Sequence, residues 1–162
     1  MGVKVIVQDI KKLETGALIV GVFEDVRPLK GLAGELDWLL CGSLSSLIIK
    51  NKLRGALGEL ALLTSRGKVP ASKIFMLGLG PRGSVSPDTL REAARSAAAA
   101  AAGAGVTSAA LEYIAPPELA TESAVSALRQ GMTEGSRESS IEISLLAPDA
   151  ASFEKISRLL TA

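Results

Sequence analysis

The sequence predicts one α/β domain of three layers, in which helices cover both faces of a mixed sheet of about six strands. Two observations support this fold class. Short apolar segments alternate with helically spaced segments through the second half of the chain, and 48% of the 162 residues are hydrophobic, enough for a substantial core. We find no internal repeat and no linker long enough to divide the chain, so we expect residues 1–162 to form a single domain.

Short apolar runs predict the strands. They span 3–7, 17–23, 57–63, 74–79, 106–111 and 141–145. The second run contains no polar residue, so we expect it to be buried on both faces of the sheet. The last run alternates apolar residues with Glu142 and Ser144, which predicts either a strand with one exposed face or a strand at the sheet edge.

Helical spacing of apolar residues predicts the helices. They span 32–48, from Ser86 through Ala101, 118–132 and 149–160. Gly42 and Ser43 are expected to break the first of these. Ser86, Pro87 and Asp88 form a strong helix start, because a capping serine precedes proline at the first helical position and an acid in the first turn.

Two residue types are scarce, which limits the available chemistry. The sequence has no histidine and one cysteine, so a zinc site built from these ligands is excluded and Cys41 cannot form an internal disulfide. Because Leu39, Leu40 and Leu44 surround it in sequence, we expect Cys41 to be a small buried apolar residue rather than a reactive thiol. We therefore predict no zinc site of this type and assign no metal ligand in the chain.

The net charge of +1 and the lack of a long apolar segment bear on partners. No apolar stretch reaches the roughly 18 residues of a membrane span, so we expect no membrane association and a cytoplasmic location. Lys50, Lys52 and Arg54 form a small basic cluster without a neighbouring aromatic residue, so we do not expect nucleic-acid binding.

A glycine-rich segment follows the predicted strand at 74–79 and has the form G-x-G-x-x-G at 78–83. Such a loop can bind an anion through its N–H groups and the following helix start. Against a dinucleotide site, Pro81 removes one N–H, and the acid that ends the next strand, Glu112, lies too far along. We therefore favour a tight turn shaped by the glycines, with anion binding as the alternative. The candidate ligand-binding residues are Gly78, Gly80, Arg82, Gly83, Ser84 and Ser86.

Several blocks, in this order and spacing, resemble the amino-terminal domain of the M17 leucyl aminopeptidases. They are K-L-R-G at 52–55, G-E-L-A-L-L at 58–63, V-P-A-S-K at 69–73, I-F-M-L-G-L-G at 74–80 and the alanine-rich helix at 86–102. The resemblance covers roughly residues 15–147 and implies a macro-domain-like fold. It also accounts for Gly78 and Gly80 without a dinucleotide.

In that family a following domain holds two divalent metals through lysine, aspartate and glutamate side chains. None of its signatures, such as N-T-D-A-E-G-R, occurs here, so no catalytic residue is transferred and we expect neither a cofactor nor enzymatic activity of the chain itself. The family's amino-terminal domain contributes to assembly of a hexamer. The resemblance therefore implies a structural, assembly or regulatory role, with self-association or a partner peptidase as the interaction.

The alternative is a macro-domain-like binder of ADP-ribose or another nucleotide at residues 78–84. A peptidase in its own right is disfavoured by the missing ligands. The helix predicted at 149–160 favours a natural end over an arbitrary cut, and the reading frame downstream would separate a stand-alone protein from a fragment.

Overall fold

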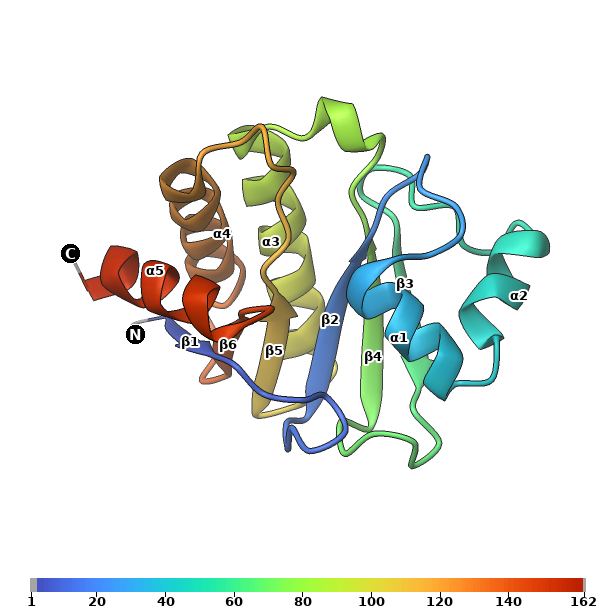
Figure 1. Cartoon of the computed structure of the whole chain (residues 1–162). Helices are drawn as coiled ribbons and strands as arrows, with labels where there is room; N and C mark the ends of the chain where they lie inside the picture. Colours follow the sequence, from blue (N-terminus) through green and yellow to red (C-terminus); the bar gives the residue numbers. More distant parts are fainter. Residues whose placement is uncertain (1–2, 162) are drawn as a thin grey trace.

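The computed structural model describes residues 3–161, which form one six-stranded sheet flanked by helices (Figure 1). The strand order is β1-β6-β5-β2-β4-β3, and every neighbouring pair is parallel except β3 and β4. The strands are β1 (Lys4–Ile6), β2 (Ala17–Val22), β3 (Leu60–Thr64), β4 (Lys73–Gly78), β5 (Ser108–Glu112) and β6 (Glu142–Leu146). The helices are α1 (Gly31–Leu39), α2 (Ser43–Ile49), α3 (Pro87–Gly103), α4 (Thr121–Gly135) and α5 (Ala150–Thr161), with a 3₁₀ turn at Arg82–Ser84.

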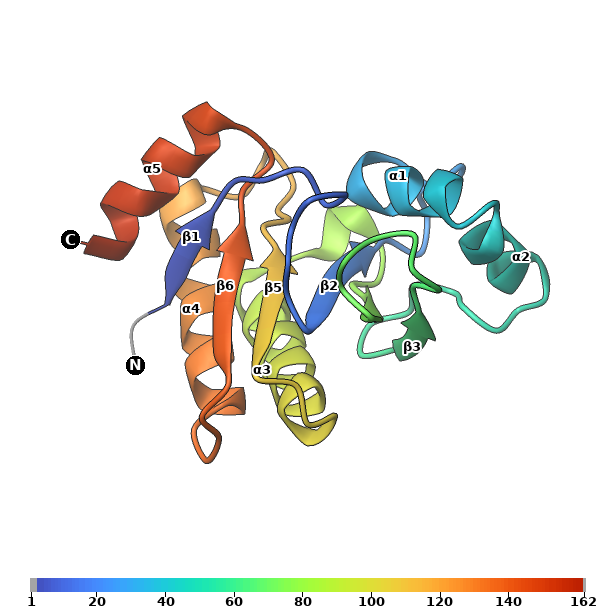
Figure 2. The same ribbon diagram turned by 90° about the horizontal axis from the view of Figure 1, so that it is seen from below.

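Helices cover both faces of the sheet, as the sequence predicts (Figures 1 and 2). On one face α3 and α4 pack against the sheet through buried alanines and leucines, and α5 lies beside β1 and α4. On the other face α1 and α2 pack over β2, β4 and β3, while Ile10 and Leu13 from the β1–β2 loop complete the core. The mixed α/β sandwich is therefore confirmed.

The central strand β2 is buried along its whole length. It pairs with β4 along its whole length on one side and with β5 at residues 17–19 on the other. Because the strand is buried by both layers of helices, polar side chains are disfavoured here, and the uninterrupted apolar run 17–22 follows from that position.

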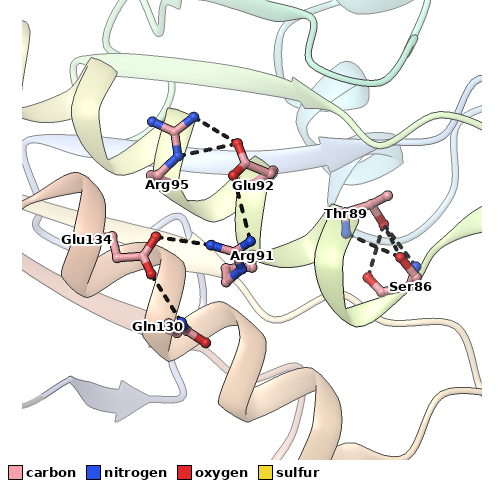
Figure 3. Close-up of polar contacts among 7 residues, drawn as sticks. All are labelled: Ser86, Thr89, Arg91, Glu92, Arg95, Gln130 and Glu134. Atoms are coloured by element: carbon pink, nitrogen blue, oxygen red, sulfur yellow. Dashed lines mark hydrogen bonds and ion pairs between the residues drawn. The ribbon is translucent and has the colours of Figure 1, made fainter.

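Small residues let α3 and α4 approach closely. A Cβ built on Gly131 would lie 2.2 Å from the carbonyl oxygen of Arg91, and one on Gly135 would lie 2.3 Å from that of Arg95. An ion pair links the two helices beside this contact, since Arg91 Nη1 lies 3.3 Å from Glu134 Oε2 (Figure 3). Glycine in α4 and alanine in α3 are thus requirements of helix packing rather than low complexity.

The start of α3 is a reciprocal cap (Figure 3). The Thr89 N–H donates to Ser86 Oγ at 3.2 Å, and the Ser86 N–H donates to Thr89 Oγ1 at 2.9 Å. Pro87 occupies the first helical position, where no N–H partner is required. The strong helix start predicted at Ser86 is confirmed.

The break in the first helical segment is also confirmed, since α1 and α2 are separated at 40–42 and Gly42 has φ +81°. One other prediction is wrong. Cys41 is exposed, because it sits in that break with φ +56°, outside the leucine-lined core. Of the two alternatives for β6, the exposed face is borne out at Glu142, whereas β6 is not an edge strand, because β1 pairs along its outer side.

Two elements begin three residues later than predicted. β3 begins at Leu60 rather than at residue 57, because Gly58, with φ +87°, turns the chain first. α4 begins at Thr121 rather than at residue 118, because a turn follows Pro116 and Pro117.

Within residues 3–161 no single helix is long and apolar enough to cross a membrane. α1 and α2 meet that criterion only together, and they are bent by 106° at their junction.

Candidate functional site

The carboxyl ends of the five parallel strands meet at one edge of the sheet. β2 leads into α1 on one face, whereas β5 leads into α4 on the other, so the connections diverge between these two neighbouring strands. In open α/β sheets such a switch point leaves a crevice at the strand ends where ligands bind. The fold therefore directs attention to the ends of β2 and β5, with the glycine-rich segment after β4 on the next strand.

Several backbone N–H groups of the glycine-rich segment 78–86 already donate to acceptors elsewhere in the chain. The Gly80 N–H donates to the Gly55 carbonyl at 2.8 Å, and the Arg82 N–H donates to Asp25 Oδ1 at 2.9 Å. The Leu79 N–H donates to the Val22 carbonyl at the end of β2 at 3.0 Å. An anion at this loop would have to displace these acceptors, including a carboxylate.

Gly78, the last residue of β4, and Gly80, just after it, are required by close backbone contacts. A Cβ on Gly78 would lie 2.0 Å from the Ala56 carbonyl oxygen, which is far inside van der Waals contact. Gly80 has φ +73°, a conformation that side chains disfavour, and a Cβ there would press on Leu57. Both glycines thus serve the packing of the loop before β3 against the end of β4.

Hydrogen bonds of the segment 52–63 explain why its residues matter for the fold. Glu59 Oε1 accepts hydrogen bonds from the N–H groups of Arg54 at 2.9 Å and Gly55 at 2.7 Å. The Arg27 guanidinium donates to the Arg54 carbonyl at 2.7 Å and to the Phe23 carbonyl at 2.7 Å. These bonds join the loops that follow β2 and α2 at one end of the sheet.

The candidate ligand residues are divided between different environments. Gly78 and Gly80 are buried, whereas Gly83 and Ser84 are exposed on the 3₁₀ turn. The Ser86 hydroxyl is engaged in the cap of α3. Arg82 is the one of the six whose side chain borders a cavity at the strand ends.

A carboxylate that we did not propose as a site residue lies at the switch point. Glu112 ends β5, and its Oε1 accepts a hydrogen bond from the Gly21 N–H of β2 at 3.1 Å. Burial raises the pKa of Glu112 to about 7, while the bond from Gly21 acts in the opposite direction. The sequence signal for Glu112 was an acidic residue at the end of a predicted buried strand. Its hydrogen bond to Gly21, 91 residues earlier in the chain, could not be predicted from the sequence.

Two cavities flank Glu112, and both also border Gly31 at the start of α1. The larger cavity, about 480 Å³, lies towards β6 and the loop after β1. The smaller cavity, about 270 Å³, lies towards the loop after β2 and includes Arg82. A Cβ on Gly31 would meet nothing within 4 Å, so the backbone between the cavities is open.

The described residues offer no cluster of side chains that could bind a metal ion. Across residues 3–161 no three His, Cys, Asp or Glu side chains come together in a way that could hold a metal ion. The donors present therefore do not fit the two divalent metals of the M17 catalytic domain, and no metal-dependent step is derived for this chain.

The chain is similar in sequence to the N-terminal part of cytosol aminopeptidases. Residues 19–140 match the family model of the cytosol aminopeptidase family, N-terminal domain. A probable cytosol aminopeptidase of Geobacter sulfurreducens is 38% identical over 111 residues, which are 68% of this chain and 22% of that protein. A second, from Alkaliphilus oremlandii, is 31% identical over 91 residues, which are 56% of this chain and 18% of that protein. The chain thus spans about a fifth of the length of these relatives.

Solved structures resemble the fold over nearly the whole chain. A mutant of tomato leucine aminopeptidase matches with a TM-score of 0.68 and 18% identity, covering 98% of this chain and 35% of that one. The macrodomain of Oceanobacillus iheyensis with ADP matches with a TM-score of 0.77 and 15% identity, covering 97% of this chain and 88% of that one. These identities establish a macrodomain-like fold and nothing about ligands. On the family match, the chain belongs to the cytosol aminopeptidase (M17) family, of which it carries the N-terminal domain.

Proposed function

We propose that this chain is a non-catalytic assembly domain that binds another protein chain through the β3 end of its sheet. The observation that carries the proposal is a set of exposed apolar side chains at that end, called here the β3 patch. Its members and their exposed fractions are Trp38 (83%), Ile49 (80%), Leu57 (55%) and Leu62 (53%).

The β3 patch draws on consecutive elements that lie together at one end of the molecule. α1, α2 and β3 occupy the right-hand side of Figure 1, and the same end is at the right in Figure 2. Isolated exposed apolar residues are ordinary, but exposed tryptophan, isoleucine and leucine residues on neighbouring elements at one end of a fold are typical of a protein interface. Tryptophan is also among the residues that contribute most binding energy when an interface buries it.

The edge strand supports the same reading. β3 is the last strand of the sheet, and its five residues, L-A-L-L-T, contain no charge and no proline. Natural sheets usually protect a free edge with such residues, because unpaired N–H and C=O groups invite another chain. The edge of β3 carries no such protection.

Charge around the β3 patch favours a different partner over a second copy. Five exposed basic residues flank β3 in sequence, and none forms an ion pair within residues 3–161; they are Lys50, Lys52, Arg54, Arg66 and Lys68. In a symmetric pair these charges would face one another and repel. The proposed binding partner is therefore a peptidase subunit of the same family that presents an apolar face bordered by carboxylates.

The test is co-purification and light scattering with an M17 peptidase from the same organism. We expect a complex that weakens as salt is raised and that is lost in a Trp38→Ala/Ile49→Ser variant. Val7→Ser, which changes an apolar residue exposed at 43% away from the β3 patch, is the matched control and should bind normally. A symmetric dimer of this chain alone, or no complex at all, would contradict the proposed partner.

The non-catalytic part of the proposal has its own test. Hydrolysis of a leucine amide by the repurified chain with added manganese would contradict it. Relatives named cytosol aminopeptidases also support a cytoplasmic location as part of this proposal.

Nucleotide binding at 78–84 is the weaker candidate function. It is supported by Arg82 at the smaller cavity and by fold similarity to macrodomains crystallised with ADP. The internal hydrogen bonds of Gly80 and Arg82 stand against it. A thermal-shift panel with ADP and ADP-ribose separates the candidates, since a ligand at ~100 times its Kd should stabilise the fold by ~2.7 kcal/mol.

A further inference from the structure

The larger cavity beside Glu112 is lined by negatively charged side chains, whereas the glycine loop carries the positively charged Arg82. Three carboxylates border it, Asp9, Glu35 and Glu112, and no lysine or arginine does. Its remaining wall is mostly apolar and consists of Val7, Ile10, Leu32, Leu146, Ala147 and Pro148, with Gln8, Gly31 and Tyr113 completing it. The cavity is therefore apolar in its body and acidic at its polar positions.

Glu112 is the carboxylate with unused bonding capacity. One of its oxygens accepts the Gly21 N–H at 3.1 Å, and the other has no partner among residues 3–161. Asp9, by contrast, accepts from the Lys11 N–H at 3.0 Å and pairs with the Lys11 ammonium at 3.7 Å. Glu112 is only partly exposed, so a ligand that brings a cation to its second oxygen would stabilise its charge.

The surroundings restrict what that ligand can be. Carboxylates would repel a phosphate or another anion, whereas the donor groups do not come together closely enough to hold a metal ion. An organic cation satisfies both conditions, and its apolar part would cover the valine, isoleucine and leucine side chains of the wall.

We propose that the larger cavity binds a primary ammonium group carried on a compact apolar body, with the free oxygen of Glu112 as its ion partner. Glu35 at the mouth adds a second negative charge, and the open backbone at Gly31 leaves space for entry. Lys30 and Arg82 border only the smaller cavity, on the other side of Glu112. The site is independent of the β3 patch, so either proposal can fail without the other.

The test compares three ligands with one carbon skeleton: isopentylamine, isopentanol and isovalerate. Each is titrated into ¹⁵N-labelled protein, and the amide resonances of Gly21, Gly31 and Glu112 are followed. We expect saturable shifts with the amine, weaker shifts with the alcohol and none with the carboxylate. Equal binding of amine and alcohol, or no binding of the amine, would overturn the proposal.

Two variants locate the interaction. Glu112→Gln keeps an oxygen for the Gly21 N–H and removes the charge, so the amine affinity should fall roughly tenfold or more. Glu35→Gln, on the exposed face of α1, should lower it by a smaller factor without disturbing the fold. Glu138→Gln, an exposed carboxylate far from the cavity in sequence, is the control and should leave the affinity unchanged. Unchanged affinity in both Glu112→Gln and Glu35→Gln would place the amine elsewhere.

The pH dependence provides a further readout. Because burial raises the pKa of Glu112 to about 7, a fall from about pH 8 to about pH 6 should weaken amine binding roughly tenfold, while the alkylammonium stays charged like a lysine. The other titratable groups around Glu112 are Asp9, Glu35 and Tyr113 at the larger cavity and Lys30 and Arg82 at the smaller one. A flat profile between these pH values would contradict Glu112 as the ion partner.

Discussion

The backbone N–H of Gly21 donates to Oε1 of Glu112 at 3.1 Å, joining the carboxyl ends of β2 and β5. This bond places a carboxylate between two cavities at the point where the chain connections leave the sheet in opposite directions. It also satisfies only part of that carboxylate, so burial still raises its pKa. The relationship therefore bears on stability as well as on ligand binding.

Glu112 should make the protein less stable as pH rises from about 4.5 to about 7. Its pKa is raised from 4.5 to about 7, so in that window the folded state binds the proton that the unfolded state has released. The full cost, on the order of 3 kcal/mol, is present above about pH 7 and absent below about pH 4.5. Urea denaturation should show Glu112→Gln more stable than the parent at pH 8 and similar to it near pH 4.5. Glu138→Gln should follow the parent at both pH values.

Gly131→Ala should lower the free energy of unfolding by about 2 kcal/mol. The new methyl group would meet the Arg91 carbonyl oxygen at 2.2 Å, and the strain of overpacking exceeds the gain in helix propensity. Gly103→Ala, where a Cβ meets nothing within 4 Å, is the matched helical glycine and should stay within about 0.5 kcal/mol. Equal stability of the two variants in urea would show that α3 and α4 are not so closely packed.

Gly78 at the end of β4 and Gly83 in the loop after it should respond differently to alanine. Gly78→Ala should lose at least about 2 kcal/mol, because its Cβ would lie 2.0 Å from the Ala56 carbonyl oxygen. Gly83→Ala has open space and should be nearly neutral. Thermal denaturation of both variants tests this, and a tolerated Gly78→Ala would remove the packing explanation of this glycine.

Ser86→Ala should cost about 1 kcal/mol, since it removes the acceptor for the Thr89 N–H at the start of α3. Ser126→Ala, an exposed serine within α4, is the control and is expected to be neutral or slightly stabilising. Chemical denaturation measures both changes. A loss shared equally by the two variants would argue against a specific capping role.

Much of the fold was predictable because it depends on local patterns. The apolar run at 17–22 indicates a strand buried on both faces, and Ser86 with Pro87 marks the start of α3. Element boundaries and edges were less predictable. Whether β6 is an edge strand depends on β1, which lies more than a hundred residues away in the chain and pairs with it in register.

For the candidate sites, the sequence identified the glycine loop but could not account for its bonds. Gly80 and Arg82 donate to Gly55 and Asp25, which come from other loops, and these partners become visible only in three dimensions. The exposure of Cys41 was missed for a related reason, since its leucine neighbours point into the core while its own backbone turns away.

The sequence by itself determined the α/β class, the cap of α3, the lack of histidine ligands and the family resemblance, because each depends on residue type and local spacing. Only the tertiary structure decided that the glycine loop is internally bonded and that Glu112 lies between two cavities next to Gly21. The physical reason is that burial and hydrogen-bond partners are set by segments distant in the chain. The pKa of Glu112 is raised by such surroundings, which no local pattern around it records.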